Sequence, residues 1–129
     1  MLTDRRAHTT LPAADMDRAI RWYEEKLGFK PLWRNPAGAM YQAGDGTRFQ
    51  SYPTPDAGKA PQTVMGFVTP DIEGDVRALK ARGVVFEDYD LPTLKTIGSI
   101  ATMGSVRAAW FRDSEENILG LVHFPDFQT

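Results

Sequence analysis

The residues of this chain that suit ligand chemistry lie along two expected strands. His8 belongs to an expected strand over residues 5–11, and its imidazole can serve as a metal ligand, a hydrogen-bond donor, a general base or a structural group. Arg48, Gln50 and Tyr52 alternate along a second expected strand, so their side chains share one face. An arginine, an amide and a phenol on one face suit a polar or anionic ligand. The alternative for Arg48 is a solvated position at the strand end.

Two aromatic residues and an acidic run lie near the end of the chain. Trp110 and Phe111 are adjacent, so a strand would direct them to opposite faces. We predict that Phe111 packs in the core and that Trp110 faces a ligand cavity. For the acidic residues Asp113, Glu115 and Glu116 that follow, we predict a solvated turn.

Composition argues against several function classes. The chain has 129 residues, with 15 basic and 17 acidic side chains, a formal net charge of −2 and no cysteine. That balance leaves no basic footprint for nucleic acid or an anionic membrane. No apolar run reaches the length of a membrane-spanning helix. We therefore predict one cytoplasmic domain over residues 1–129, with neither nucleic acid nor membrane as partner. Nucleophile elbows, phosphate loops and Cys/His zinc patterns are missing from the sequence.

The strongest structural signal is a capped helix. Asp15 is a good N-cap because its carboxylate can accept an unpaired backbone N–H of the first turn. Apolar residues then recur at helical spacing, and Gly28 supplies the left-handed residue that ends the helix. The apolar stripe consists of Met16, Ala19, Ile20, Tyr23 and Leu27. The sequence therefore predicts a helix over residues 15–27, preceded by a strand that Pro12 ends.

The same unit recurs in the second half of the chain. Asp71 is the next N-cap and Gly83 the next stop, and an apolar stripe lies between them. Asp71 follows Asp15 by 56 residues, and Arg77 follows Arg21 by the same interval. A nearly constant offset over cap, stripe and stop indicates duplication of one supersecondary unit. The alternative is two unrelated strand–helix pairs with similar caps.

Each copy is expected to continue with three strands. In the first copy they fall at residues 29–34, 39–43 and 47–52, and in the second at residues 84–88, 107–112 and 118–124. Module one thus spans about residues 5–53, a linker about 54–61, and module two about 62–124, beginning with a strand over 62–68. Each module would be a four-stranded sheet with one helix. Residues 91–105 lack clean periodicity, and a stretch of that length predicts a lid or the wall of a site.

These motifs together resemble the vicinal oxygen chelate superfamily, the glyoxalase, bleomycin-resistance and extradiol-dioxygenase group. The resemblance covers nearly the whole chain. It rests on His8-x-x-Leu11-x-x-x-Asp15, Ala19-x-x-x-Tyr23-x-x-x-Leu27-Gly28-Phe29, the helix from Asp71 to Gly83, and Ala109-Trp110-Phe111-Arg112-Asp113 with Asn117-Ile118. It implies an α+β fold of two βαβββ modules whose curled mixed sheets enclose a cavity. This matches the duplication found from the caps and stops.

In metal-dependent members of that superfamily, the first and last strands of each module supply His, Glu or Gln ligands. The resemblance places these positions at His8, Gln50, Val64 and Gly120. Valine and glycine have no side-chain donor atom, and catalytic zinc sites typically use three protein ligands. His123 lies three residues after Gly120, so strand alternation puts it on the other face. We therefore predict that the metal site is lost and that no cofactor is bound.

The sequence leaves several functions open. The leading hypothesis is a protein resembling the bleomycin-resistance branch, which binds an unidentified small molecule through His8, Arg48, Gln50, Tyr52 and Trp110. The main alternative is an enzyme, a glyoxalase-like lyase or isomerase or a dioxygenase, with a divalent metal held by His8, Gln50 and a non-standard ligand. A metal-free enzyme and a module whose side chains fill its own cavity are further alternatives. The resemblance also implies a homodimer.

Overall fold

The first predicted helix forms with its cap and stop. In a computed structural model that describes residues 1–125, Asp15 Oδ1 accepts the backbone N–H of Arg18 at 3.0 Å. Helix α1 spans Met16–Trp22 and continues as a wider π-helical turn, Tyr23–Leu27. Gly28 ends it with a φ of 78°, a conformation that favours glycine. The prediction for residues 15–27 is therefore confirmed, apart from the widened last turn.

The first half of the chain builds a four-stranded sheet, sheet A, in the order β1-β4-β3-β2. Its strands are β1 (Thr9–Ala13), β2 (Trp33–Asn35), β3 (Gly38–Gln42) and β4 (Arg48–Pro53). Strand β1 is parallel to β4, and the other pairs are antiparallel. The prediction that Pro12 ends the first strand was wrong, because Pro12 lies inside β1. An edge strand tolerates a residue without an N–H.

The second half of the chain also begins with a strand followed by a capped helix. Strand β5 (Thr63–Val68) leads to helix α2 (Ile72–Ala81), and Asp71 Oδ1 accepts the backbone N–H of Gly74 at 3.1 Å. Gly83 has a φ of 87°. Strand β5 lies parallel to β11 (Ile118–His123), as β1 lies parallel to β4, and β11 pairs with β10 (Val106–Arg112). The two halves therefore share one strand–helix–strand topology.

The second sheet, sheet B, is wider than predicted. Its order is β5-β11-β10-β9-β8-β7, and β6 (Phe86–Glu87) pairs with the C-terminal part of β10. Residues 91–105, predicted as an irregular lid or site wall, mostly form strands of this sheet. They include part of β7 (Asp90–Leu91), all of β8 (Leu94–Ile97) and all of β9 (Ile100–Met103). Gly98 and Ser99, both with positive φ, make the tight turn between β8 and β9, and this explains the interrupted pattern.

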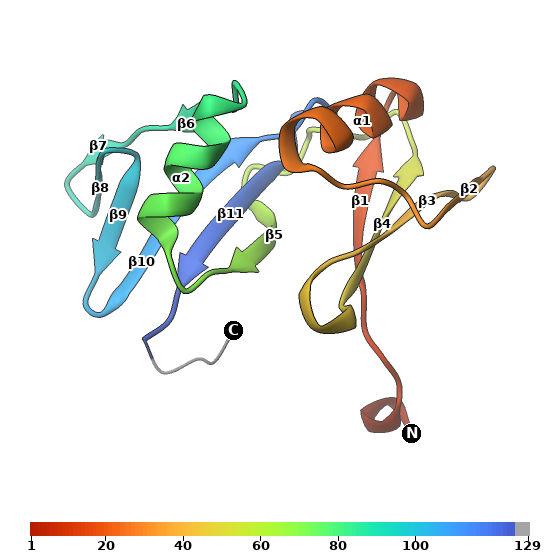
Figure 1. Cartoon of the computed structure of the whole chain (residues 1–129), viewed down its shortest axis with the longest axis horizontal. Coiled ribbons are helices and arrows are strands. Elements are labelled where there is room, and N and C mark those ends of the chain that lie inside the picture. The colour runs from red at the N-terminus through yellow and green to blue at the C-terminus, as the bar shows by residue number, and fades with distance from the viewer. Residues whose placement is uncertain (126–129) are drawn as a thin grey trace.

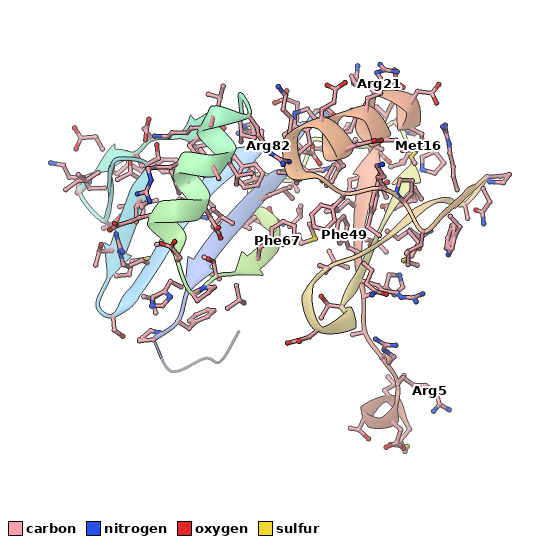
Figure 2. All side chains as sticks on the ribbon, in the orientation of Figure 1. Arg5, Met16, Arg21, Phe49, Phe67 and Arg82 are labelled. Carbon is pink, nitrogen blue, oxygen red and sulfur yellow. The ribbon has the colours of Figure 1, made fainter. Side chains whose placement is uncertain are left out.

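The helices lie over their own sheets, and the two halves meet along their edge strands β1 and β5 (Figure 1). One hydrophobic core runs through both halves. Figure 2 shows Phe49 and Phe67 facing one another across the junction, and their ring centroids lie 6.2 Å apart. Phe29 stacks on Phe67 at 5.8 Å, so the two sheets share an aromatic contact. None of the helices within residues 1–125 is long and apolar enough to cross a membrane.

Candidate ligand-binding site

A cleft of about 620 Å³ lies where the two sheets meet. His8 and Arg48 line it from the first half, and residues 65–68 of β5 line it from the second. The side chains of His8 and Arg48 are exposed, and neither forms an ion pair or a side-chain hydrogen bond with any residue in the described part of the chain. An imidazole and a guanidinium beside the apolar side chains of Phe67 and Val68 suit an anionic ligand with an apolar body.

The face of sheet A that α1 does not cover carries Arg48, Gln50 and Tyr52. Phe49 and Ser51, which alternate with them, are buried, so the predicted shared face is confirmed. The Nε2 of Gln50 donates to the backbone oxygen of Ala37 at 3.0 Å, which fixes the amide and leaves its oxygen free to accept. Tyr52 remains 38% exposed. Neither Gln50 nor Tyr52 lines the junction cleft.

The corresponding face of sheet B carries Trp110. Phe111 is fully buried, as predicted, and Trp110 therefore points to the opposite side of β10. Tyr89 packs edge-on against the indole, with ring centroids 5.6 Å apart. Gly66 and Gly120 are paired neighbours in β5 and β11, and Gly120 sits opposite Trp110. Gly120 is buried beside Thr63 and Trp110, whereas Gly66 in the next strand is exposed, and a flat ring can lie on its bare backbone.

The four positions that resemblance assigns to metal ligands do not make a metal site. His8 and Gln50 belong to the first half, whereas Val64 and Gly120 belong to the second and carry no donor atom. Among residues 1–125, no group of three or more His, Asp or Glu side chains is placed to hold a metal ion. His123 Nδ1 lies 2.9 Å from the backbone oxygen of Thr69, so one of its ring nitrogens is already engaged. The donor set therefore does not fit a catalytic divalent ion.

The acidic run is not the solvated turn that the sequence suggested. Asp113 and Glu115 are each only 4% exposed, and only Glu116 is exposed to solvent. Asp113 Oδ2 accepts the hydroxyl of Tyr23 at 2.6 Å and the Nδ2 of Asn117 at 2.9 Å. Its other oxygen accepts the backbone N–H groups of residues 115 and 117. The prediction was wrong because the turn between β10 and β11 packs against the first half of the chain.

Glu115 makes the second polar link between the halves. Its carboxylate accepts two hydrogen bonds from the Arg18 guanidinium, at 2.8 and 3.0 Å, and one from the backbone N–H of Asp15 at 2.9 Å. Burial pushes the pKa of Glu115 upward, but these donors outweigh it and hold the pKa below its ordinary value. For Asp113, burial dominates and raises the pKa despite the hydrogen bonds from Tyr23 and Asn117. Burial also raises the pKa of Tyr23 well above its usual range.

The structure thus brings together only part of the predicted site. His8 and Arg48 share the junction cleft, Gln50 and Tyr52 lie on the same sheet face as Arg48, and Trp110 lies on the other sheet. Sequence reasoning missed Tyr89, which it assigned to no role, and Gly66. Strand parity could have placed Gly66 beside Gly120 once β5 and β11 were known to pair.

Comparison with known proteins gives a family match over most of the chain. The model of the family described as Glyoxalase/Bleomycin resistance protein/Dioxygenase superfamily matches residues 5–119. No curated protein matches the chain.

Solved structures share the fold at low sequence identity. A glyoxalase/bleomycin resistance protein/dioxygenase from Alicyclobacillus acidocaldarius is 22% identical, with a TM-score of 0.71, over 95% of this chain and 93% of its own. A bleomycin-binding protein solved in complex with bleomycin is 21% identical, with a TM-score of 0.71, over 93% of this chain and 98% of its own. The protein UcmS2 is 20% identical, with a TM-score of 0.72, over 92% of this chain and 96% of its own.

Proposed function

This chain belongs to the glyoxalase/bleomycin resistance protein/dioxygenase superfamily, and from that premise we propose that it is a small-molecule-binding member without a catalytic metal. Its role would resemble that of the bleomycin-binding protein with which it shares the fold, namely to hold a ligand without transforming it. The ligand we propose has a planar aromatic part and a polar or anionic part.

One observation carries this proposal: the uncovered faces of both sheets display ligand-binding chemistry that the protein itself does not use. Trp110 stands opposite Gly120, and the exposed backbone of Gly66 follows in the next strand, which supports an aromatic ring on sheet B. Arg48, with no partner in residues 1–125, and the free amide oxygen of Gln50 support a polar group on sheet A. Two of the four positions for metal ligands lack donor atoms, which favours binding over metal-dependent catalysis.

We further propose that the protein is a homodimer in which the uncovered face of sheet A in one copy approaches sheet B of the other. In a single copy, Tyr52, Trp33 and Val68 are 38%, 38% and 44% exposed, respectively. Burial of such side chains would favour association, and a shared pocket would unite the Arg48 face with the Trp110 face. Analytical ultracentrifugation of the full chain tests this. A single species with the mass of one chain at all concentrations would contradict the proposed dimer.

The binding proposal is tested with a panel of planar aromatic compounds, metal-free bleomycin among them. We expect at least one compound to raise the melting temperature, because a ligand that binds only the folded state stabilises it. Trp110→Ala should weaken that compound's affinity by up to about tenfold, since stacking on an aromatic side chain contributes about 0.5–1.5 kcal/mol. Arg48→Gln should also weaken it, whereas Arg5→Gln is the matched control because Arg5 lies beyond both sheets (Figure 2).

Titration with nickel, zinc, manganese and ferrous iron tests the absence of a metal site. We expect no tight stoichiometric binding. Tight binding that disappears in the His8→Ala variant would overturn the proposal, and a metal-dependent lyase, isomerase or dioxygenase with His8 and Gln50 as ligands would replace it. The proposed site would also be contradicted if every compound that binds had the same affinity for the Trp110→Ala variant and for the unchanged protein.

A further inference from the structure

A second groove lies on the other face of sheet B, beside helix α2. It has a volume of about 660 Å³ and runs between α2 and the β8–β9 hairpin. The hairpin widens sheet B on the side away from β5 and β11, beyond the part that α2 covers (Figure 1). The first half has no such extension, because sheet A ends at β2. The groove is therefore a product of the added hairpin and not of the repeated fold.

The groove is strongly basic. Arg77 and Lys80 line it from α2, Lys95 from β8 and Arg107 from β10, whereas Glu73 is its only carboxylate. These residues carry a local charge of +3 on a chain whose formal net charge is −2. Four cations around one groove attract anions, and field lines concentrate in such concave surfaces.

Two of these cations are fully or partly committed within the protein. Arg107 Nη2 donates to Glu73 at 2.8 Å, and Lys95 lies 3.7 Å from Asp90. Lys80 Nζ lies 5.9 Å from the centre of the Phe86 ring and has no carboxylate partner in the described residues. Arg77 is exposed and forms neither an ion pair nor a side-chain hydrogen bond within residues 1–125. Two positive charges therefore remain available to an external group.

The floor of the groove is apolar. Val76 and Ile100 are 3% and 8% exposed, and Ile97 at the hairpin turn is 80% exposed although it lines the same groove. Ile97 pairs with Ile100 across the hairpin, so both side chains belong to the face that α2 approaches. An exposed isoleucine beside unpaired cations is matched by a ligand that has an apolar body and an acidic head.

We propose that the groove between α2 and the β8–β9 hairpin binds a small amphiphilic anion. The acidic head contacts Arg77 and Lys80, and the apolar body covers Ile97 and Ile100. This site is separate from the one proposed above, because Trp110 and Arg48 lie on the uncovered faces of the sheets and line no part of this groove.

The first experiment is an NMR titration of the full-length 15N-labelled protein with octanoate, below the concentration at which octanoate self-associates. We expect saturable amide shifts that cluster in α2, β8 and β9. Octanol, which lacks the charge, and inorganic phosphate, which lacks the apolar body, should each bind at least about fivefold more weakly. Equal binding of octanol, shifts that cluster elsewhere, or no saturable shift would each overturn the proposal.

Two matched pairs of variants locate the contacts. Arg77→Gln should weaken octanoate about fivefold, whereas Arg21→Gln should not change it. Arg21 occupies the equivalent position on α1, which faces no added hairpin, and it points away from sheet B (Figure 2). Ile97→Ser should also weaken octanoate about fivefold, with the exposed Val85→Ser as its control. Equal effects within either pair would contradict the assignment.

A last variant separates the two proposed sites. Trp110→Ala should leave octanoate affinity unchanged. If Trp110→Ala abolishes octanoate binding and Arg77→Gln does not affect it, the anion binds on the uncovered sheet face and the groove proposal is wrong.

Discussion

The two halves of the molecule use equivalent turns differently. In the first half, the turn Gly44–Gly46 joins β3 to β4, is largely exposed and borders the junction cleft. In the second half, the turn over residues 113–117 joins β10 to β11, and its Asp113 and Glu115 are buried against the first half. Equivalent turns of one topology therefore have different roles: the turn in the first half borders the junction cleft, and the turn in the second half makes the polar link between the halves.

The glycines show a similar difference. Gly38 begins β3 with a φ of 128°, and a Cβ there would lie 1.9 Å from the backbone oxygen of Ser51. Gly66 and Gly120 have ordinary backbone angles, and a Cβ on either would meet no atom closer than 3.5 Å. In the first half a glycine is required by the backbone. In the second half the exposed Gly66 keeps a surface bare, which is consistent with the ligand surface proposed beside Trp110.

Gly38→Ala should have the largest effect on stability. The added methyl group clashes with rigid backbone at a φ that L residues rarely adopt, so we expect a loss of about 4 kcal/mol in the free energy of unfolding. Urea denaturation measures it, with Gly66→Ala as the matched control in the second half. Similar losses in both variants would remove the distinction between the two kinds of glycine.

Asp113→Asn should have the next largest effect, a loss of about 3 kcal/mol in the free energy of unfolding. The asparagine must place an NH₂ group against donors that now meet a carboxylate, in a site that excludes water. Asp45→Asn alters the equivalent exposed turn and should change stability by less than about 0.5 kcal/mol. Equal costs in the two turns would show that the buried network does not link the halves.

Glu115→Gln should cost about 2 kcal/mol near neutral pH, because it weakens hydrogen bonds to a charged group. The folded pKa of Glu115 is lowered, so the unfolded chain binds the proton more tightly. Its stabilisation is thus present above the ordinary pKa of 4.5 and is lost as pH falls through the lower folded pKa. The difference between Glu115→Gln and the unchanged protein should shrink below pH 4.5.

Urea denaturation across that pH range measures the difference, and Glu116→Gln is the exposed control. Asp113 contributes with the opposite sign, since its raised folded pKa makes its ionisation unfavourable to the fold. Asp113 is present in both proteins, so its contribution cancels to first order. A difference that stays constant with pH would contradict the assignment to the Glu115 carboxylate.

Gly66→Ala should have the smallest effect on stability, within about 0.5 kcal/mol, because the new methyl group meets only the backbone oxygen of Gly120, at 3.8 Å, which is an ordinary van der Waals contact. It should nevertheless weaken the aromatic ligand that the panel identifies, since the methyl group occupies the proposed surface beside Trp110. Calorimetric titration of that ligand tests this. Unchanged affinity would place the ring elsewhere on the sheet.

The sequence by itself determined the local structure. Asp15 and Asp71 predicted both helix starts, Gly28 and Gly83 predicted both ends, and their spacing predicted the duplicated fold. Strand parity separated Trp110 from Phe111 and grouped Arg48 with Gln50 and Tyr52. These inferences succeed because caps, stops and alternation depend on neighbours within a few residues.

Only the tertiary structure decided what each surface meets. The acidic residues of 113–117 look like a solvated turn in sequence, and they are buried because Arg18 and Tyr23, nearly a hundred residues earlier, supply their partners. Residues 91–105 look irregular because two short strands and a positive-φ turn interrupt any long pattern. Their pairing with β10, and the basic groove that results, depend on contacts between distant segments, which local periodicity does not encode.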